Sequence, residues 1–133
     1  MRLVNYGAGE LSDRLTILSL KLLFGAEAGK DLTAFTAERT VLLSQIRSRT
    51  LNGVWFASLL ELAAVNAALW HAEDDLRAIR LASPELSLAA TVALAFRIQM
   101  LNDQRATLIE KINKDAGEGG SSDKVFRETK EEA

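Results

Sequence analysis

The sequence predicts an all-α protein, an antiparallel four-helix arrangement like a bundle, built on a long helical hairpin and followed by a disordered C-terminal tail. The chain has one proline in 133 residues, and apolar residues rarely alternate with polar ones, so strands are not expected. Between about residues 54 and 115, apolar residues recur instead at steps of three and four. That spacing is typical of helices that bury one face.

The first two helices are predicted to be short. The first covers about residues 10–24, and Gly25 is interpreted as its C-terminal stop. The second covers about residues 31–49, with Asp31 as N-cap because its carboxylate can accept from free amides of the first turn. Its residues expected to point inward are Leu32, Phe35, Leu42, Leu43 and Ile46.

The last two helices are predicted to be long. The third covers about residues 54–81, after the turn signal at 52–53. The fourth covers about 84–115, where Ser83 would cap and Pro84 would occupy the first helical position. At 1.5 Å per residue each is about 40–48 Å long, and the short connection makes them an antiparallel hairpin. The first two helices are then expected to cover the apolar seam of this hairpin.

Composition limits the partners and the kinds of site that we expect for this protein. Hydrophobic residues make up 48% of the chain and charged residues 26%, with a net charge of −2, so no basic excess is present to bind nucleic acid. Cysteine is absent, which excludes disulfides and thiolate metal sites. The most apolar run, residues 86–96, is too short for a membrane span. We expect a cytoplasmic protein with one helical domain (1–116), a flexible polar tail (117–133), and no nucleic-acid or membrane partner.

An arginine interrupts the apolar stripe of the fourth helix, between Leu101 and Leu108. A buried guanidinium without a partner would cost several kcal/mol, so Arg105 is expected to reach a carboxylate or water. Asp13 lies in register with the apolar face of the first helix, and Glu73 borders the seam of the third. We predict that polar residues from three helices meet near Arg105. The candidate cluster comprises Asp13, Asn66, Trp70, Glu73, Arg77, Asn102, Asp103 and Arg105.

Three interpretations of this cluster are open. It can be a structural ion pair that fixes helix register, a site for a ligand or partner, or a catalytic site. The single histidine, His71, cannot build a histidine metal site or a confident triad. The carboxylates Glu10, Asp13, Glu73 and Asp103 could form a ring for Mg²⁺, as in helical nucleotide pyrophosphatases, but the paired spacing of those enzymes is missing. We predict no metal and no cofactor.

Three sequence blocks carry a family resemblance: GELSDRLTIL (9–18), NAALWHAEDDLR (66–77) and LNDQRATLIEKIN (101–113). Together they resemble a family of small, uncharacterised bacterial all-helical proteins, a domain of unknown function. Arg14 replaces a lysine of the family pattern, and Leu108 and Ile109 replace its basic residue. The resemblance implies an association with surface-polysaccharide and glycosyl-transfer genes, but no activity.

These observations lead to two expectations for function. The first is a helical accessory or interaction protein that binds a protein partner or forms a homodimer. The second is a site for a phosphorylated or nucleotide-sugar ligand, or a Mg²⁺-dependent enzyme, at the polar cluster between the helices. There Arg105 and Arg77 would hold phosphate, and Asp13 or Glu73 would act as a base.

Overall fold

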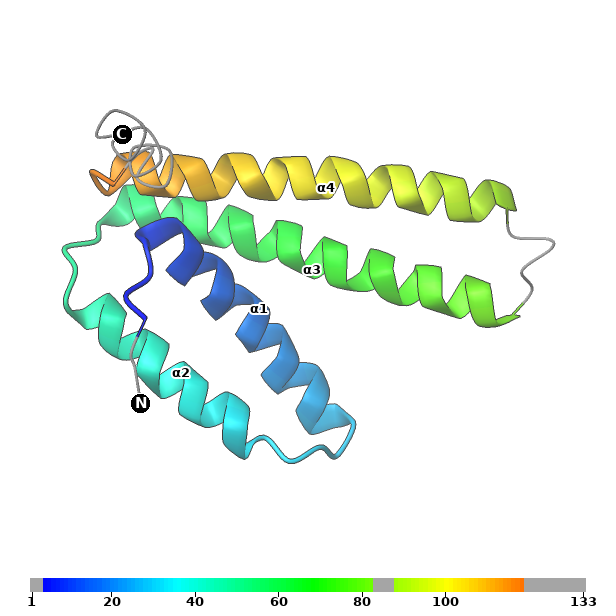
Figure 1. The fold of residues 1–133 in the computed structure, drawn as a ribbon, viewed down its shortest axis with the longest axis horizontal. Helices are drawn as coiled ribbons and strands as arrows, with labels where there is room; N and C mark the ends of the chain where they lie inside the picture. The colour runs from blue at the N-terminus through cyan, green and yellow to red at the C-terminus, as the bar shows by residue number, and fades with distance from the viewer. Residues whose placement is uncertain (1–3, 83–87, 119–133) are drawn as a thin grey trace, which may run out of the picture.

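A computed structural model describes residues 4–82 and 88–118. Within these ranges the chain forms four α-helices and no strand. The helices are α1 (Ala8–Glu27), α2 (Thr33–Arg47), α3 (Gly53–Ala82) and α4 (Leu88–Asp115). The predicted all-α fold on a long helical hairpin is confirmed (Figure 1).

The four helices lie in successive layers. In Figure 1, α3 and α4 run side by side over their full length, and α1 lies against the end of this hairpin where α3 begins and α4 ends. Helix α1 contacts both α3 and α4, whereas α2 packs against α1. The expectation that the first two helices both cover the seam is therefore wrong for α2. Helix α1 has two packed faces, and α2 covers the outer one.

Two glycines shape the turn after α1. The helix continues through Gly25 to Glu27, so the prediction that Gly25 ends it is wrong. Gly25 is buried, and a Cβ there would lie 2.9 Å from Cδ2 of Leu32, so the glycine permits close approach of the following segment. Gly29, with φ of 70°, adopts the left-handed conformation of the turn instead.

Side-chain hydrogen bonds precede two of the helices. The prediction that Asp31 is the N-cap of α2 is wrong, because the N-cap position belongs to Leu32 and α2 begins at Thr33; Asp31 Oδ1 nevertheless accepts from the Thr33 amide at 3.0 Å. Asn52, predicted only as part of a turn, accepts from the amides of Val54 and Trp55 at the start of α3. The predicted cap at residues 83–85 lies outside the described residues.

The buried apolar residues form three small clusters. The first joins α1, α3 and α4, the second joins α1 and α2, and the third is the seam between α3 and α4. The predicted α3 stripe faces inward, with Leu62, Leu69 and Ala72 buried. Leu43 of α2 is 39% exposed, so its inward prediction is wrong. Only one face of α2 meets α1, and Leu42 and Ile46 occupy it.

The molecule divides into a base and an arm. The base comprises residues 4–72 and 101–118, and the arm comprises residues 73–82 and 88–100. All the buried residues lie in the base, and none of the described arm residues is buried. Figure 1 shows the reason, since the far ends of α3 and α4 extend beyond α1 and α2. The arm is two helices with one shared seam.

Helix α3 is also long and apolar enough, by length and composition alone, to cross a membrane. Core helices of soluble proteins pass the same test. In this structure α3 packs against α1 and α4 and contributes Asn66, which is 3% exposed, to a buried polar network.

Candidate functional site

A buried carboxylate in α1 is the centre of the predicted polar cluster. Asp13 is 5% exposed. Its Oδ1 accepts from Arg105 Nε at 2.9 Å and its Oδ2 from Arg105 Nη2 at 2.5 Å. Asn66 Nδ2 donates to the same Oδ1 at 2.9 Å and to Thr16 Oγ1 at 2.7 Å. The structure thus brings α1, α3 and α4 together through Asp13, Asn66 and Arg105, with the side chain of Thr16 completing the network.

The charged and polar side chains of this network are paired with one another. The pKa of Arg105 is raised because its side chain hydrogen-bonds to Asp13, while partial burial acts in the opposite direction. The attraction of Glu73 adds a smaller contribution that also raises the pKa of Arg105. Among the described residues, no buried side-chain nitrogen or oxygen lacks a partner. Both carboxylate oxygens of Asp13 are thus engaged within the protein.

The other predicted residues lie around the network without joining it. Glu73 and Asn102 are exposed, and no hydrogen bond of either side chain is found among the described residues. Arg77 pairs with Asp74 on the surface of α3. Trp70 stacks on Phe24 with ring centroids 5.5 Å apart, and so fastens the end of α1 to α3.

A second polar contact between α1 and α3 was not predicted. Trp55 Nε1 donates to Ser12 Oγ at 2.9 Å, and the Ser12 hydroxyl donates in turn to the Ala8 carbonyl at 2.7 Å. Ser12 is fully buried. Ser12, Asp13 and Thr16 share one face of α1 at helical spacing. This spacing is the pattern from which the contact could have been predicted in the sequence. All three are buried polar residues, so hydrogen bonds contribute to the contact of α1 with the hairpin beside the apolar packing of Ala8 and Phe24.

The first amides of α1 are capped by the end of α4. Asn113 Oδ1 accepts from the Gly9 amide at 2.7 Å, and the Glu118 carboxylate accepts from the Ala8 amide at 3.2 Å. Glu118 also pairs with Arg49 at 3.3 Å. Residue 118 falls in the predicted tail range, yet its side chain is bound to the start of α1 and to Arg49.

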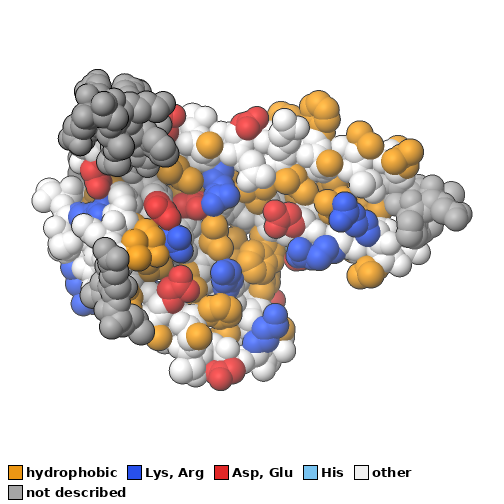
Figure 2. All heavy atoms as spheres, viewed as in Figure 1, with side chains coloured by type: hydrophobic (Ala, Val, Ile, Leu, Met, Phe, Trp, Pro, Cys, Tyr) orange, Lys and Arg blue, Asp and Glu red, His pale blue; other side chains and the backbone are white. Residues whose placement is uncertain are grey.

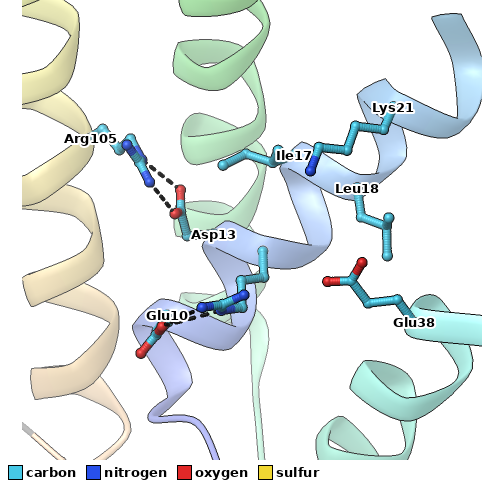
Figure 3. A pocket seen from close by; sticks show the side chains of 8 residues that line it. Glu10, Asp13, Ile17, Leu18, Lys21, Glu38 and Arg105 are labelled. Carbon is cyan, nitrogen blue, oxygen red and sulfur yellow. Dashed lines mark hydrogen bonds and ion pairs between the residues drawn. The ribbon is translucent and has the colours of Figure 1, made fainter. Parts of the chain in front are cut away.

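A polar cleft lies beside the network, between α1, α2 and α4. Its volume is about 280 Å³, and Arg14, Lys21, Glu38 and Arg105 are among the charged residues that line it. Figure 3 shows Lys21 of α1 and Glu38 of α2 directed toward the same space. Arg14 pairs with Glu10 at 3.1 Å, whereas neither Lys21 nor Glu38 forms an ion pair within the described residues. The cleft thus offers one ammonium and one carboxylate to a small molecule.

The carboxylates considered for Mg²⁺ do not form a metal site. Asp13 is occupied by Arg105, and Asp103 lies on an exposed part of α4 beside an apolar hollow between α3 and α4. Within residues 4–82 and 88–118, no group of three or more potential ligands could hold a metal ion.

The arm carries a feature that the sequence analysis missed. Four large apolar side chains of α4 are exposed at steps of four residues: Leu88 (72%), Val92 (54%), Phe96 (65%) and Met100 (56%). We call these four residues the outer stripe. Figure 2 shows hydrophobic side chains along the upper edge of the projecting part, where Figure 1 places α4. The residues that face α3 are different ones, Leu94 and Ile98.

Comparisons with known protein families, with curated proteins and with solved structures find no match to this chain. The family resemblance of the three sequence blocks therefore stays a prediction. The residues on which it rests are nonetheless brought together in part, since Asp13, Asn66 and Arg105 come from one block each.

Proposed function

We propose that the protein is a helical interaction module that uses the outer stripe of its arm to bind an amphipathic helix of a protein partner. One observation supports this above the others. Four large apolar residues at helical spacing stay exposed on an arm that the rest of the described chain leaves uncovered. Contiguous apolar patches on monomeric proteins commonly mark interaction sites.

The polar network in the base has a different role from the outer stripe on the arm. Because Asp13 is fully paired with Arg105 and Asn66, the cluster serves to lock α1 onto the hairpin. The base thereby fixes one end of α3 and α4, the two helices whose other ends form the arm. The resemblance of the three sequence blocks would link this module to surface-polysaccharide and glycosyl-transfer pathways.

The test is site-specific photo-crosslinking of the full chain in cells. A photoreactive phenylalanine derivative replaces Phe96, and the matched control carries it at Thr40, an exposed residue of α2. We expect adducts at position 96 whose partner peptide, identified by mass spectrometry, is an amphipathic helix. If position 96 gives no more protein adduct than position 40, or only lipid adducts, the proposal is wrong.

The polar cleft favours a second candidate function, the binding of a small phosphorylated molecule. Lys21 lines the cleft without an ion-pair partner among the described residues, so its ammonium is available to a phosphate group. The two arginines of the cleft are already paired, Arg14 with Glu10 and Arg105 with Asp13. At about 280 Å³ the cleft is at the lower limit of usual ligand pockets. That size favours a sugar phosphate over a nucleotide sugar.

Thermal unfolding with glucose 1-phosphate, with and without Mg²⁺, tests this second candidate. Bound ligand should raise the melting temperature of the wild type. Lys21→Met should abolish the increase, and Lys30→Met, on the exposed turn after α1, should not. No shift for the wild type at millimolar ligand would argue against the site.

A further inference from the structure

The outer stripe is complementary to itself. Its four residues are evenly spaced along α4, so reversing the direction of the helix reproduces the same pattern of apolar positions. We propose that the amphipathic helix bound by the outer stripe is α4 of a second copy of this chain, antiparallel to the first. This inference rests on the proposed function of the arm and specifies its partner.

A two-fold axis between Val92 and Phe96 defines the register. It places Val92 of one copy opposite the second copy's Phe96, and Leu88 opposite the second copy's Met100. Every contact then occurs twice, as a closed two-fold interface requires. No residue of the stripe is left without an apolar partner.

The surface beside the stripe suits close helix packing. A ridge formed by residues four apart packs into the groove next to a ridge of the same kind on another helix. Exposed alanines flank the stripe on both sides, with Ala89 and Ala93 on one side and Ala95 on the other. Small side chains there leave grooves into which the ridge of a second copy can fit.

The apolar area of the stripe is adequate for a dimer. At the exposed fractions given above, the four side chains present on the order of 500 Å² of surface. One partner in a standard interface buries about 800 Å², of which roughly 60% is apolar. The stripe supplies about that amount before any contribution from neighbouring residues.

Charge argues against a membrane as the alternative occupant. Helices that lie on a membrane surface are usually rich in Lys and Arg on their polar face. Residues 88–102 of α4 contain a single cation, Arg97. Apolar burial against protein requires no such cations, so a second copy fits this composition better.

The first experiment measures the mass of the purified full chain by sedimentation equilibrium at micromolar concentration. We expect a dimer, with a dissociation constant that Phe96→Glu raises at least about thirty-fold, the effect of a 2 kcal/mol hot spot. The Phe96 side chain is largely exposed in the single chain, so the melting temperature of the dilute variant should match that of the wild type. A wild-type chain that stays monomeric at 100 μM overturns the inference.

A charge exchange tests the antiparallel register. Val92→Lys and Phe96→Glu should each weaken self-association. Mixed together, they should form a heterodimer more tightly than either variant pairs with itself, because Lys at 92 meets Glu at 96 across the axis. A mixture that associates no better than the separate variants contradicts the register.

Introduced cysteines provide a matched control in this cysteine-free chain. In the proposed dimer the two copies of residue 93 lie about two residues apart along the helix axis, whereas the two copies of residue 106 are roughly 36 Å apart. Ala93→Cys should therefore form a covalent dimer with a short bis-maleimide reagent, and Ala106→Cys should not. Equal yields for the two variants count against the model of the interface.

The results separate this inference from the proposed function. A monomeric protein whose position 96 crosslinks to a helix of another protein in cells overturns the second copy as occupant and leaves the interaction module standing. A monomer without protein adducts at position 96 overturns both. A dimer that Phe96→Glu does not weaken places the interface elsewhere and overturns the inference.

Discussion

The base and the arm are made from the same two long helices, yet they are stabilised in different ways. In the base, α3 and α4 are covered by α1, and Ser12, Asp13 and Thr16 of α1 bind them through buried hydrogen bonds. In the arm the same helices share only one seam, and none of the described residues is buried. Polar contacts thus fix the packing at one end of this helix pair, whereas the other end is left exposed and can associate with another helix. Four sets of substitutions test how the base and the arm are stabilised.

Truncation of core leucines should give the largest contrast in stability. Leu62 is fully buried in the base, so Leu62→Ala should lower the free energy of unfolding by about 2–5 kcal/mol. Leu81, 87% exposed at the end of α3, should change it by less than about 0.5 kcal/mol when replaced by alanine. Leu108, partly exposed but packed against the Leu62 cluster, should give an intermediate loss. Urea unfolding measures all three, and equal losses at 62 and 81 would contradict the division into base and arm.

Removal of the half-buried cation Arg105 should be the next largest effect. Arg105→Met leaves the Asp13 carboxylate with Asn66 alone, and should lower the free energy of unfolding by about 2–4 kcal/mol. This is below the full loss for a buried pair because the Arg105 side chain is 34% exposed. Combining it with Asp13→Leu should recover much of the loss, since no buried charge then remains. If Arg105→Met melts at or above the wild-type temperature, the arginine is retained at a cost to stability and the cluster merits a search for a ligand.

Two glycines provide a third comparison within the base. A Cβ at Gly9 would lie 2.4 Å from the Ile109 carbonyl oxygen, which is backbone and cannot move aside alone. Gly9→Ala should therefore cost about 1–3 kcal/mol. Gly53 at the start of α3 has nothing within 4 Å of such a Cβ, so Gly53→Ala should leave stability unchanged or slightly higher. A harmless Gly9→Ala would mean that α1 sits farther from α4 than the structure indicates.

The smallest effect is expected at Asp31, in the turn before α2. Hydrogen bonds from the Thr33 side chain and amide lower the pKa of Asp31. A lowered pKa in the folded chain means that the cap contributes stability above the unfolded pKa and loses it as pH falls through the folded value. Asp31→Ala should melt slightly below the wild type at pH 7, and the difference should vanish in acid. A difference that persists at low pH would assign the effect to something other than the charge of Asp31.

The base was more predictable from the sequence than the arm. The steps of three and four in α3 and α4 required helices, and Arg105 within an apolar stripe required a carboxylate, which the structure identifies as Asp13. Glu73 was an equally good candidate by periodicity. The choice between them depends on the packing of α1, which no local pattern specifies. The exposure of Phe96 was also hidden, because a sequence does not show where a neighbouring helix ends.

The capping of α1 by distant residues has a consequence for how the protein folds during synthesis. Asn113 and Glu118 are separated by 104 and 110 positions from the amides that they bind. Arg105 is separated from Asp13 by 92 positions. A ribosome releases α1 and α2 long before these partners are made, and until then the Asp13 carboxylate and the first amides of α1 lack their native partners from the C-terminal part of the chain. Contacts between such distant positions slow folding. The protein is therefore expected to reach its native state late in translation, in one cooperative step that begins once α4 is complete.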